Sequence, residues 1–141
     1  MTVDEKLLEV REYTDEGYQP IVDYGAWRVA ILNYDPGLEP DAIRSMQRHG
    51  ETDEVFVLLS GKCILFLGDG DETIDSIHAA DMQPLKAYNV KKSAWHSHTL
   101  SKDAAVLIVE NRDTQASNSP SQNLTATQCA EIVQLTKDCW A

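Results

Sequence analysis

The chain has 141 residues, a length at which one domain buries a hydrophobic core without disulfides. Its formal net charge is −11, with 12 Lys and Arg residues against 23 Asp and Glu, and so few basic residues argue against a nucleic-acid partner. Three well-separated cysteines, an acidic N-terminus and the lack of an apolar run of about 18 residues are typical of a soluble cytoplasmic protein without membrane contact.

The N-terminal part of the chain predicts two strands. Residues 4–12 fit either a short helix or an entry strand, and the sequence does not decide between them. Residues 21–24 and 26–34 are rich in β-forming side chains, with a turn at Gly25 between them. Residues 35–41 contain Pro and Gly and predict a loop.

Residues 43–61 predict two strands joined by a short acidic turn, the second being the apolar run 55–59. Side chains two apart on a strand share a face, so Gln47 and His49 should point together. Glu54 can face them from the neighbouring strand. The sequence therefore predicts an imidazole and a carboxylate in one pocket.

Short strands continue through the rest of the chain. They are predicted at residues 62–67, 73–78, 82–85, 87–90, 94–98 and 104–111. Many short strands with turn residues and no helix between them indicate an all-β fold, an antiparallel sandwich or barrel.

The C-terminal segment has two parts. Residues 112–123 are polar and predict an exposed connector. Thr125 and Gln128 have the spacing of a capping box, and the apolar residues that follow predict a helix packed on the outside of the sheets. We expect residues 1–115 to form the β-barrel with its N-terminal strands, and residues 116–141 to be the connector and helix of the same domain.

The pattern resembles the two sequence motifs of the cupin superfamily over residues 43–110. The first motif, G-x5-H-x-H-x(3,4)-E-x6-G, is matched by Gln47, His49, Glu54 and Gly61, with Gln47 in place of the first His and no leading Gly. The second motif, G-x5-P-x-G-x2-H-x3-N, is matched more loosely by residues 91–96, which keep His96. The resemblance implies a small RmlC-like antiparallel jelly-roll β-barrel.

In that family these positions bind a divalent metal inside the barrel, which here implies His49, Glu54 and His96 as ligands with Gln47 in the fourth place. Two imidazoles and one carboxylate suit Fe(II), and also Mn, Ni or Zn. The alternative is a barrel whose interior polar groups only hydrogen-bond one another. His98 shares a face with His96, so it could replace the missing ligand, and we expect it beside the metal as a catalytic acid or base.

Three functions are compatible with this site. The first is a metal-dependent enzyme acting on a small polar metabolite, a sugar or a carboxylate, as an isomerase, lyase or dioxygenase. The second is a non-catalytic module that binds a sugar-like ligand. The third is metal-free acid–base catalysis of the sugar-epimerase type, with a His and a Tyr, for which Tyr88 is a distant candidate. The fold does not choose among them.

The apolar run 55–59 also bears on association. Phe56 and Leu58 share a face with Glu54 and are expected inside the barrel, so Val55, Val57 and Leu59 point outward. An apolar outer face requires a cover, which the N-terminal strands, the terminal helix or a second subunit could provide. We expect a homodimer.

Overall fold

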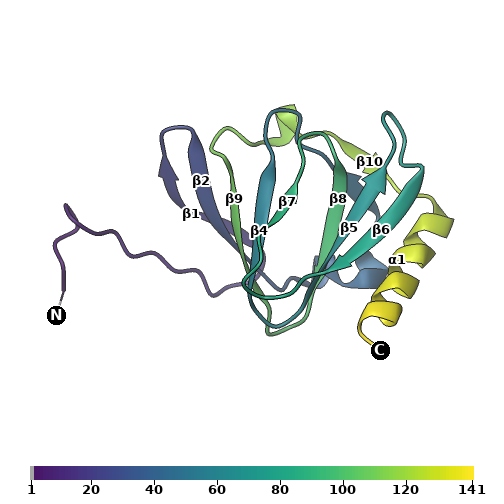
Figure 1. Cartoon of the computed structure of the whole chain (residues 1–141), viewed down its shortest axis with the longest axis horizontal. Coiled ribbons are helices and arrows are strands. Elements are labelled where there is room, and N and C mark those ends of the chain that lie inside the picture. Colours follow the sequence, from purple (N-terminus) through teal and green to yellow (C-terminus); the bar gives the residue numbers. More distant parts are fainter. Residues whose placement is uncertain (1) are drawn as a thin grey trace.

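The computed structural model describes residues 2–141, which form two five-stranded antiparallel sheets and one long helix (Figure 1). The first sheet has the order β1-β2-β9-β4-β7 and the second β10-β3-β8-β5-β6. The strands are β1 (Tyr18–Tyr24), β2 (Trp27–Asn33), β3 (Ser45–Gln47), β4 (Glu54–Ser60), β5 (Cys63–Asp69), β6 (Ser76–Asp81), β7 (Tyr88–Val90), β8 (Trp95–Leu100), β9 (Ala105–Asn111) and β10 (Ser121–Asn123). The helices are η1 (Pro36–Leu38), η2 (Pro40–Ala42), η3 (Ala116–Asn118) and α1 (Ala126–Cys139). The predicted all-β jelly roll with a C-terminal helix outside is confirmed.

The interior between the sheets is filled by alternate residues of the central strands. Phe56 and Leu58 of β4 and Val106 and Ile108 of β9 are all buried, as the period of two in these strands predicts. The register places Phe56 opposite Ile108 and Leu58 opposite Val106. The same inward alternation carries Glu54 and Glu110, at the far ends of these rows, into the interior.

A second apolar cluster lies between the second sheet and α1. Phe66, Trp95 and Ile132 are among its buried members, and α1 packs beside β6 on the outside of that sheet (Figure 1). The helix begins as predicted, because the Thr125 hydroxyl accepts from the Gln128 amide and the Gln128 side chain accepts from the Thr125 amide. No helix among residues 2–141 has the length and apolarity needed to cross a membrane.

The outer face of the first sheet has no such cover. The strands β1 and β2 continue this sheet by pairing with β9, and so they do not lie over it. Val55 and Val57 remain partly exposed, and Leu59 is 53% exposed. Of the three covers that the sequence allowed, neither the N-terminal strands nor the terminal helix provides one.

Two local predictions are wrong. Residues 82–85 do not form a strand, because Pro84 and Leu85 make a turn in which Leu85 has a φ of 67° and is 95% exposed. Residues 112–123 are only partly an exposed connector, because β10 pairs with β3 and Ser119 is buried. Polarity suggested exposure there, but these polar groups bond to the sheet edge and line a polar cavity. Residues 4–12, left open between helix and strand, form a turn at 5–7 within an otherwise irregular segment.

Candidate metal centre

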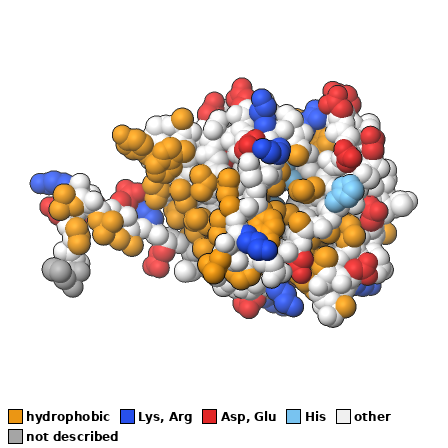
Figure 2. All heavy atoms as spheres, viewed as in Figure 1, with side chains coloured by type: hydrophobic (Ala, Val, Ile, Leu, Met, Phe, Trp, Pro, Cys, Tyr) orange, Lys and Arg blue, Asp and Glu red, His pale blue; other side chains and the backbone are white. Residues whose placement is uncertain are grey.

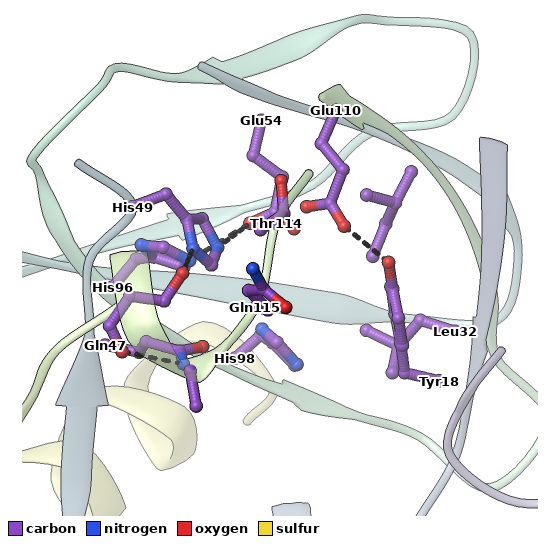
Figure 3. Close-up of a pocket in the computed structure, with 13 residues that line it drawn as sticks. Tyr18, Leu32, Gln47, His49, Glu54, His96, His98, Glu110, Thr114 and Gln115 are labelled. Atoms are coloured by element: carbon purple, nitrogen blue, oxygen red, sulfur yellow. Dashed lines mark hydrogen bonds and ion pairs between the residues drawn. The ribbon is translucent and has the colours of Figure 1, made fainter. Parts of the chain in front are cut away.

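Three buried side chains meet between the two sheets. Glu54 begins β4 of the first sheet, His96 lies on β8 of the second, and His49 lies in the loop that follows β3. One potential ligand atom from each lies within 4.8 Å of the others. They are 6%, 5% and 8% exposed, respectively, and Figure 3 shows both rings directed at the Glu54 carboxylate.

The way in which these residues converge differs from the prediction. The strand β3 ends at Gln47, so His49 does not alternate with Gln47 on one strand. Nor is β4 a neighbour of β3, since β4 pairs with β7 and β9. The chain crosses from one sheet to the other between residues 48 and 53, and the pocket therefore forms across the barrel interior instead of across one sheet.

Hydrogen bonds to the Nδ1 atoms fix the orientation of both rings. Nδ1 of His96 lies 3.0 Å from the Ala94 carbonyl oxygen, which can only accept, so Nδ1 carries the hydrogen. Nδ1 of His49 lies 2.7 Å from the Ser119 hydroxyl. The Nε2 atoms of His96 and His49 then face Oε1 of Glu54 at 3.0 and 3.2 Å. Metal-binding histidines are held by second hydrogen bonds of this kind.

The electrostatics favour charged groups at this point. Burial alone would raise the pKa of Glu54, but hydrogen bonds from His49 and His96 outweigh it, so the pKa is lowered. Burial likewise opposes a charge on His96, yet the Glu54 carboxylate raises the pKa of His96 above 6.5. The carboxylate thus favours a proton on His96 Nε2, and a metal cation can interact with Glu54 in the same way.

The spacing of the three atoms also fits a metal ion. Ligands at right angles on an ion with bonds of about 2.0–2.2 Å lie about 3 Å apart, and the two imidazole nitrogens lie 3.0 and 3.2 Å from the carboxylate oxygen. Two neutral nitrogens and one carboxylate are a donor set for Fe, Mn, Ni or Zn. The residues present therefore suit a divalent metal.

Gln47 and His98 lie beside this cluster. The Gln47 amide nitrogen donates to the Ser119 carbonyl at 3.2 Å, and the Gln47 amide oxygen has no hydrogen bond within the described residues. His98 lines the same cavity, and its buried Nδ1 has no hydrogen-bond partner among residues 2–141. Burial and the nearby His96 lower the pKa of His98 to about 4, so this imidazole is neutral at pH 7.

Two further residues of the cavity were missed by the sequence reading. Glu110 is buried at 6% exposure, and the Tyr18 hydroxyl donates a hydrogen bond to its carboxyl group (Figure 3). Burial and the adjacent Glu54 raise the pKa of Glu110 to about 8, so it carries a proton at pH 7. The sequence held a signal for Glu110, because it occupies an inward position of the apolar segment 104–111, where a carboxylate is out of place.

This raised pKa predicts how the stability of the metal-free protein depends on pH. Between pH 4.5 and about 8 folded Glu110 holds a proton that the unfolded chain has lost, which lowers the free energy of unfolding as pH rises. Up to pH 6.5 His98 opposes this decrease, because its pKa is lowered to about 4 and there the unfolded chain holds the extra proton. The net decrease should therefore lie between pH 6.5 and about 8. Glu110→Gln should flatten this decrease, with a residual slope above pH 6.5 from His96. Urea unfolding with a chelator from pH 5 to 8 measures it. Glu131→Gln, at an exposed site on α1, is the control and should keep the wild-type slope.

A second prediction concerns the serine that holds His49. Ser119→Ala removes the hydroxyl 2.7 Å from Nδ1 of His49 and frees the ring to turn. Loss of such a bond should lower metal affinity about 10- to 100-fold. Calorimetric titration of metal-stripped protein measures it, with Ser60→Ala, an exposed serine bonded to Asp103, as the control. Unchanged affinity in Ser119→Ala would contradict the role given to this hydrogen bond in holding His49 for the metal.

The comparisons with known proteins support the fold. No protein-family model and no curated sequence matches the chain. Among solved structures, the capsular polysaccharide assembling protein CapF from Staphylococcus aureus superposes with a TM-score of 0.54 at 16% identity over 79% of this chain. The chain spans 33% of the CapF chain.

Two other structures match over most of their own length. Streptomyces Pac13, described as a nucleoside dehydratase, has a TM-score of 0.53 and 10% identity, covering 82% of this chain and 87% of Pac13. The protein NMB1881 from Neisseria meningitidis has a TM-score of 0.50 and 16% identity, covering 70% of this chain and 88% of the other. Together with the matched motif positions, these neighbours show that the chain has the jelly-roll fold of the cupin superfamily.

Proposed function

We propose that the protein is a metal-dependent enzyme that acts on a small polar metabolite, with a divalent ion bound by His49, Glu54 and His96. One observation carries the proposal: the Nε2 atoms of two oriented imidazoles face a single buried carboxylate oxygen. Gln47, with its free amide oxygen, is assigned to the fourth ligand position. The ion is Fe, Mn, Ni or Zn, the metals that suit this donor set.

The metal would act as a Lewis acid that polarises a substrate oxygen or activates water or oxygen. The surrounding side chains would then handle protons. The protonated Glu110 carboxyl can donate a proton to a substrate oxygen, and Tyr18 holds it in place through its hydroxyl. His98 is neutral and lines the same cavity, and its Nδ1 has no hydrogen-bond partner among residues 2–141, so we assign it to a catalytic acid or base role.

The cavity favours an uncharged substrate over a free anion. Its volume is about 260 Å³, and no Lys or Arg of the described chain lines it. The groups available to a ligand are hydroxyls, amides, imidazoles and carboxyls, which hydrogen-bond to alcohols. A sugar or polyol fits these groups best, while a carboxylate would depend on the metal for its charge. Isomerase, lyase and dioxygenase chemistry all remain compatible, because the fold does not choose the reaction.

Metal-free acid–base catalysis is the second candidate, and the position of one tyrosine favours it. The Tyr88 hydroxyl accepts from the Gln83 amide at 2.9 Å, and Tyr88 is not among the residues that line the cavity. Tyr18 lines it instead, next to Glu110. A His and a Tyr do therefore share the pocket, but the tyrosine is not the one that the sequence suggested.

The proposal includes a cytoplasmic location and a homodimer. All three cysteines are free, in keeping with a reducing compartment. The uncovered outer face of the first sheet favours a second subunit as its cover.

Ligand binding with and without metal tests the proposed function. Metal-stripped and metal-loaded protein would be titrated with a panel of neutral sugars and polyols and with small carboxylates, and turnover followed by NMR. We expect one or more of the neutral sugars and polyols to bind, and we expect only the metal-loaded protein to bind and convert them. Equal conversion by stripped protein would favour the metal-free candidate, and saturable binding without conversion would favour a non-catalytic binding module.

A further inference from the structure

One uncovered apolar surface is the outer face of the first sheet. We define the outer face by nine side chains: Val22, Tyr24, Trp27, Val29, Ile31, Val55, Val57, Leu107 and Val109. None of them is charged. Tyr24 is 71% exposed and Trp27 is 45% exposed. Figure 2 shows hydrophobic side chains gathered over β1, β2, β9 and β4.

A second apolar surface is the N-terminal arm, which we define as residues 2–12. Every residue of the arm is exposed, including Leu7 at 82% and Val10 at 75%. Figure 1 shows the arm running away from the body instead of folding over it, and Figure 2 shows its own hydrophobic side chains. No apolar side chain of the arm belongs to either core cluster of the described residues. Within residues 2–141, Arg11 forms ion pairs only with Glu5 and Glu9 of the arm itself.

The exit of the arm from the body is fixed. The Asn33 side chain donates to the carbonyls of Tyr13 and Asp15 at 3.0 and 2.8 Å. Gly17 exchanges backbone hydrogen bonds with residues 33 and 34 at the end of β2. These contacts set the place at which the chain leaves the sheet, and Figure 1 shows the arm extending from there beyond the body.

The areas show why the face and the arm belong together. Four strands of seven residues, spaced about 4.8 Å apart with a rise of about 3.3 Å per residue, span roughly 440 Å². A stable protein interface needs about 800 Å² from each partner. The face alone falls short, and a bound arm of eleven residues can supply the difference.

We propose that the arm of one copy packs on a second copy of this chain, with the outer faces of the two copies opposed and their arms exchanged. An extended arm of this length reaches about 35–40 Å, enough to cross the roughly 23 Å length of the opposite sheet. A two-fold axis makes the exchange reciprocal, so one arrangement covers both faces and both arms. An unrelated partner would cover the face but leave the arm of this chain exposed.

This inference is independent of the metal centre, because no ligand residue belongs to the arm or the outer face. It is tested first by sedimentation velocity over about 1–100 µM. The wild type should be a dimer. The arm variant Leu7→Ser/Leu8→Ser/Val10→Ser should dimerise at least tenfold more weakly. Its residues lie outside both cores, so its thermal unfolding as a monomer should be unimpaired. Leu85→Ser, an exposed leucine outside both surfaces, is the control and should behave as wild type.

A second measurement distinguishes an arm that packs on the other chain from an arm that folds back on its own chain. In a dimer mixed from ¹³C-methyl-labelled and unlabelled chains, isotope-filtered NOEs should connect methyl groups of Leu7 and Val10 to those of Val57 and Leu107 in the other chain. Arm-to-face NOEs found only within one chain would overturn the inference. So would a wild type that stays monomeric at 100 µM, or an arm variant that dimerises as tightly as the wild type.

Discussion

Replacing His96 with Ala should abolish stoichiometric metal binding. The substitution removes one of three ligand atoms and leaves the Glu54 carboxylate without one of its two imidazole partners. The loss of affinity should exceed the about 10- to 100-fold that follows loss of a residue that only hydrogen-bonds to a metal ligand. His49→Ala and Glu54→Gln should have the same effect, because each removes a group of the same cluster. Calorimetric titration of metal-stripped protein with Zn, Mn, Ni and Fe(II) measures this.

The matched control is His78→Ala. This histidine is exposed on β6, and its one side-chain hydrogen bond among the described residues joins Nε2 to the Ser76 hydroxyl at 3.3 Å. Metal affinity should not change in this variant. If His78→Ala lowered affinity as much as His96→Ala, the metal would be bound at the surface and the interior cluster would serve only as a hydrogen-bonded network.

Replacing Phe66 with Ala should cause a large loss in the free energy of unfolding. Phe66 is fully buried in the cluster that joins the second sheet to α1. Truncation of a buried Phe to Ala costs about 3–5 kcal/mol, a large share of the about 5–15 kcal/mol that stabilises a domain. Urea unfolding measures the change, with Leu85→Ala as the control at a site that is 95% exposed. A loss below about 1 kcal/mol in Phe66→Ala would mean that the helix does not pack on the sheet as described.

Strand alternation carried most of the information that the sequence held about the fold. The run 55–59 placed Phe56 and Leu58 inside and Val57 outside, and the structure has them so. The capping box at Thr125 located the start of the helix. Both signals are local, since they depend on the backbone geometry of a few consecutive residues. The strand predicted at residues 82–85 was wrong, because the residue types in this segment do not reveal the positive φ of Leu85.

The site was harder to predict, because its parts lie in different sheets. The motif spacing predicted that His49, Glu54 and His96 form one group. It did not predict that the chain crosses from one sheet to the other to bring them together. Ser119 could not be found, since a serine in a polar segment resembles any exposed loop residue until β10 is seen to pair with β3. Tyr18 likewise depends on a contact with Glu110 that spans 92 residues of sequence. Long-range contacts of this kind leave no periodicity to read.

X-ray absorption at the metal edge of reconstituted protein tests the central claim most directly. The account predicts one ion per chain in the wild type, with two imidazole nitrogens and carboxylate oxygen among its ligands, and no stoichiometric ion in His96→Ala. A spectrum with oxygen ligands alone, or one that is the same in His96→Ala and the wild type, would contradict it.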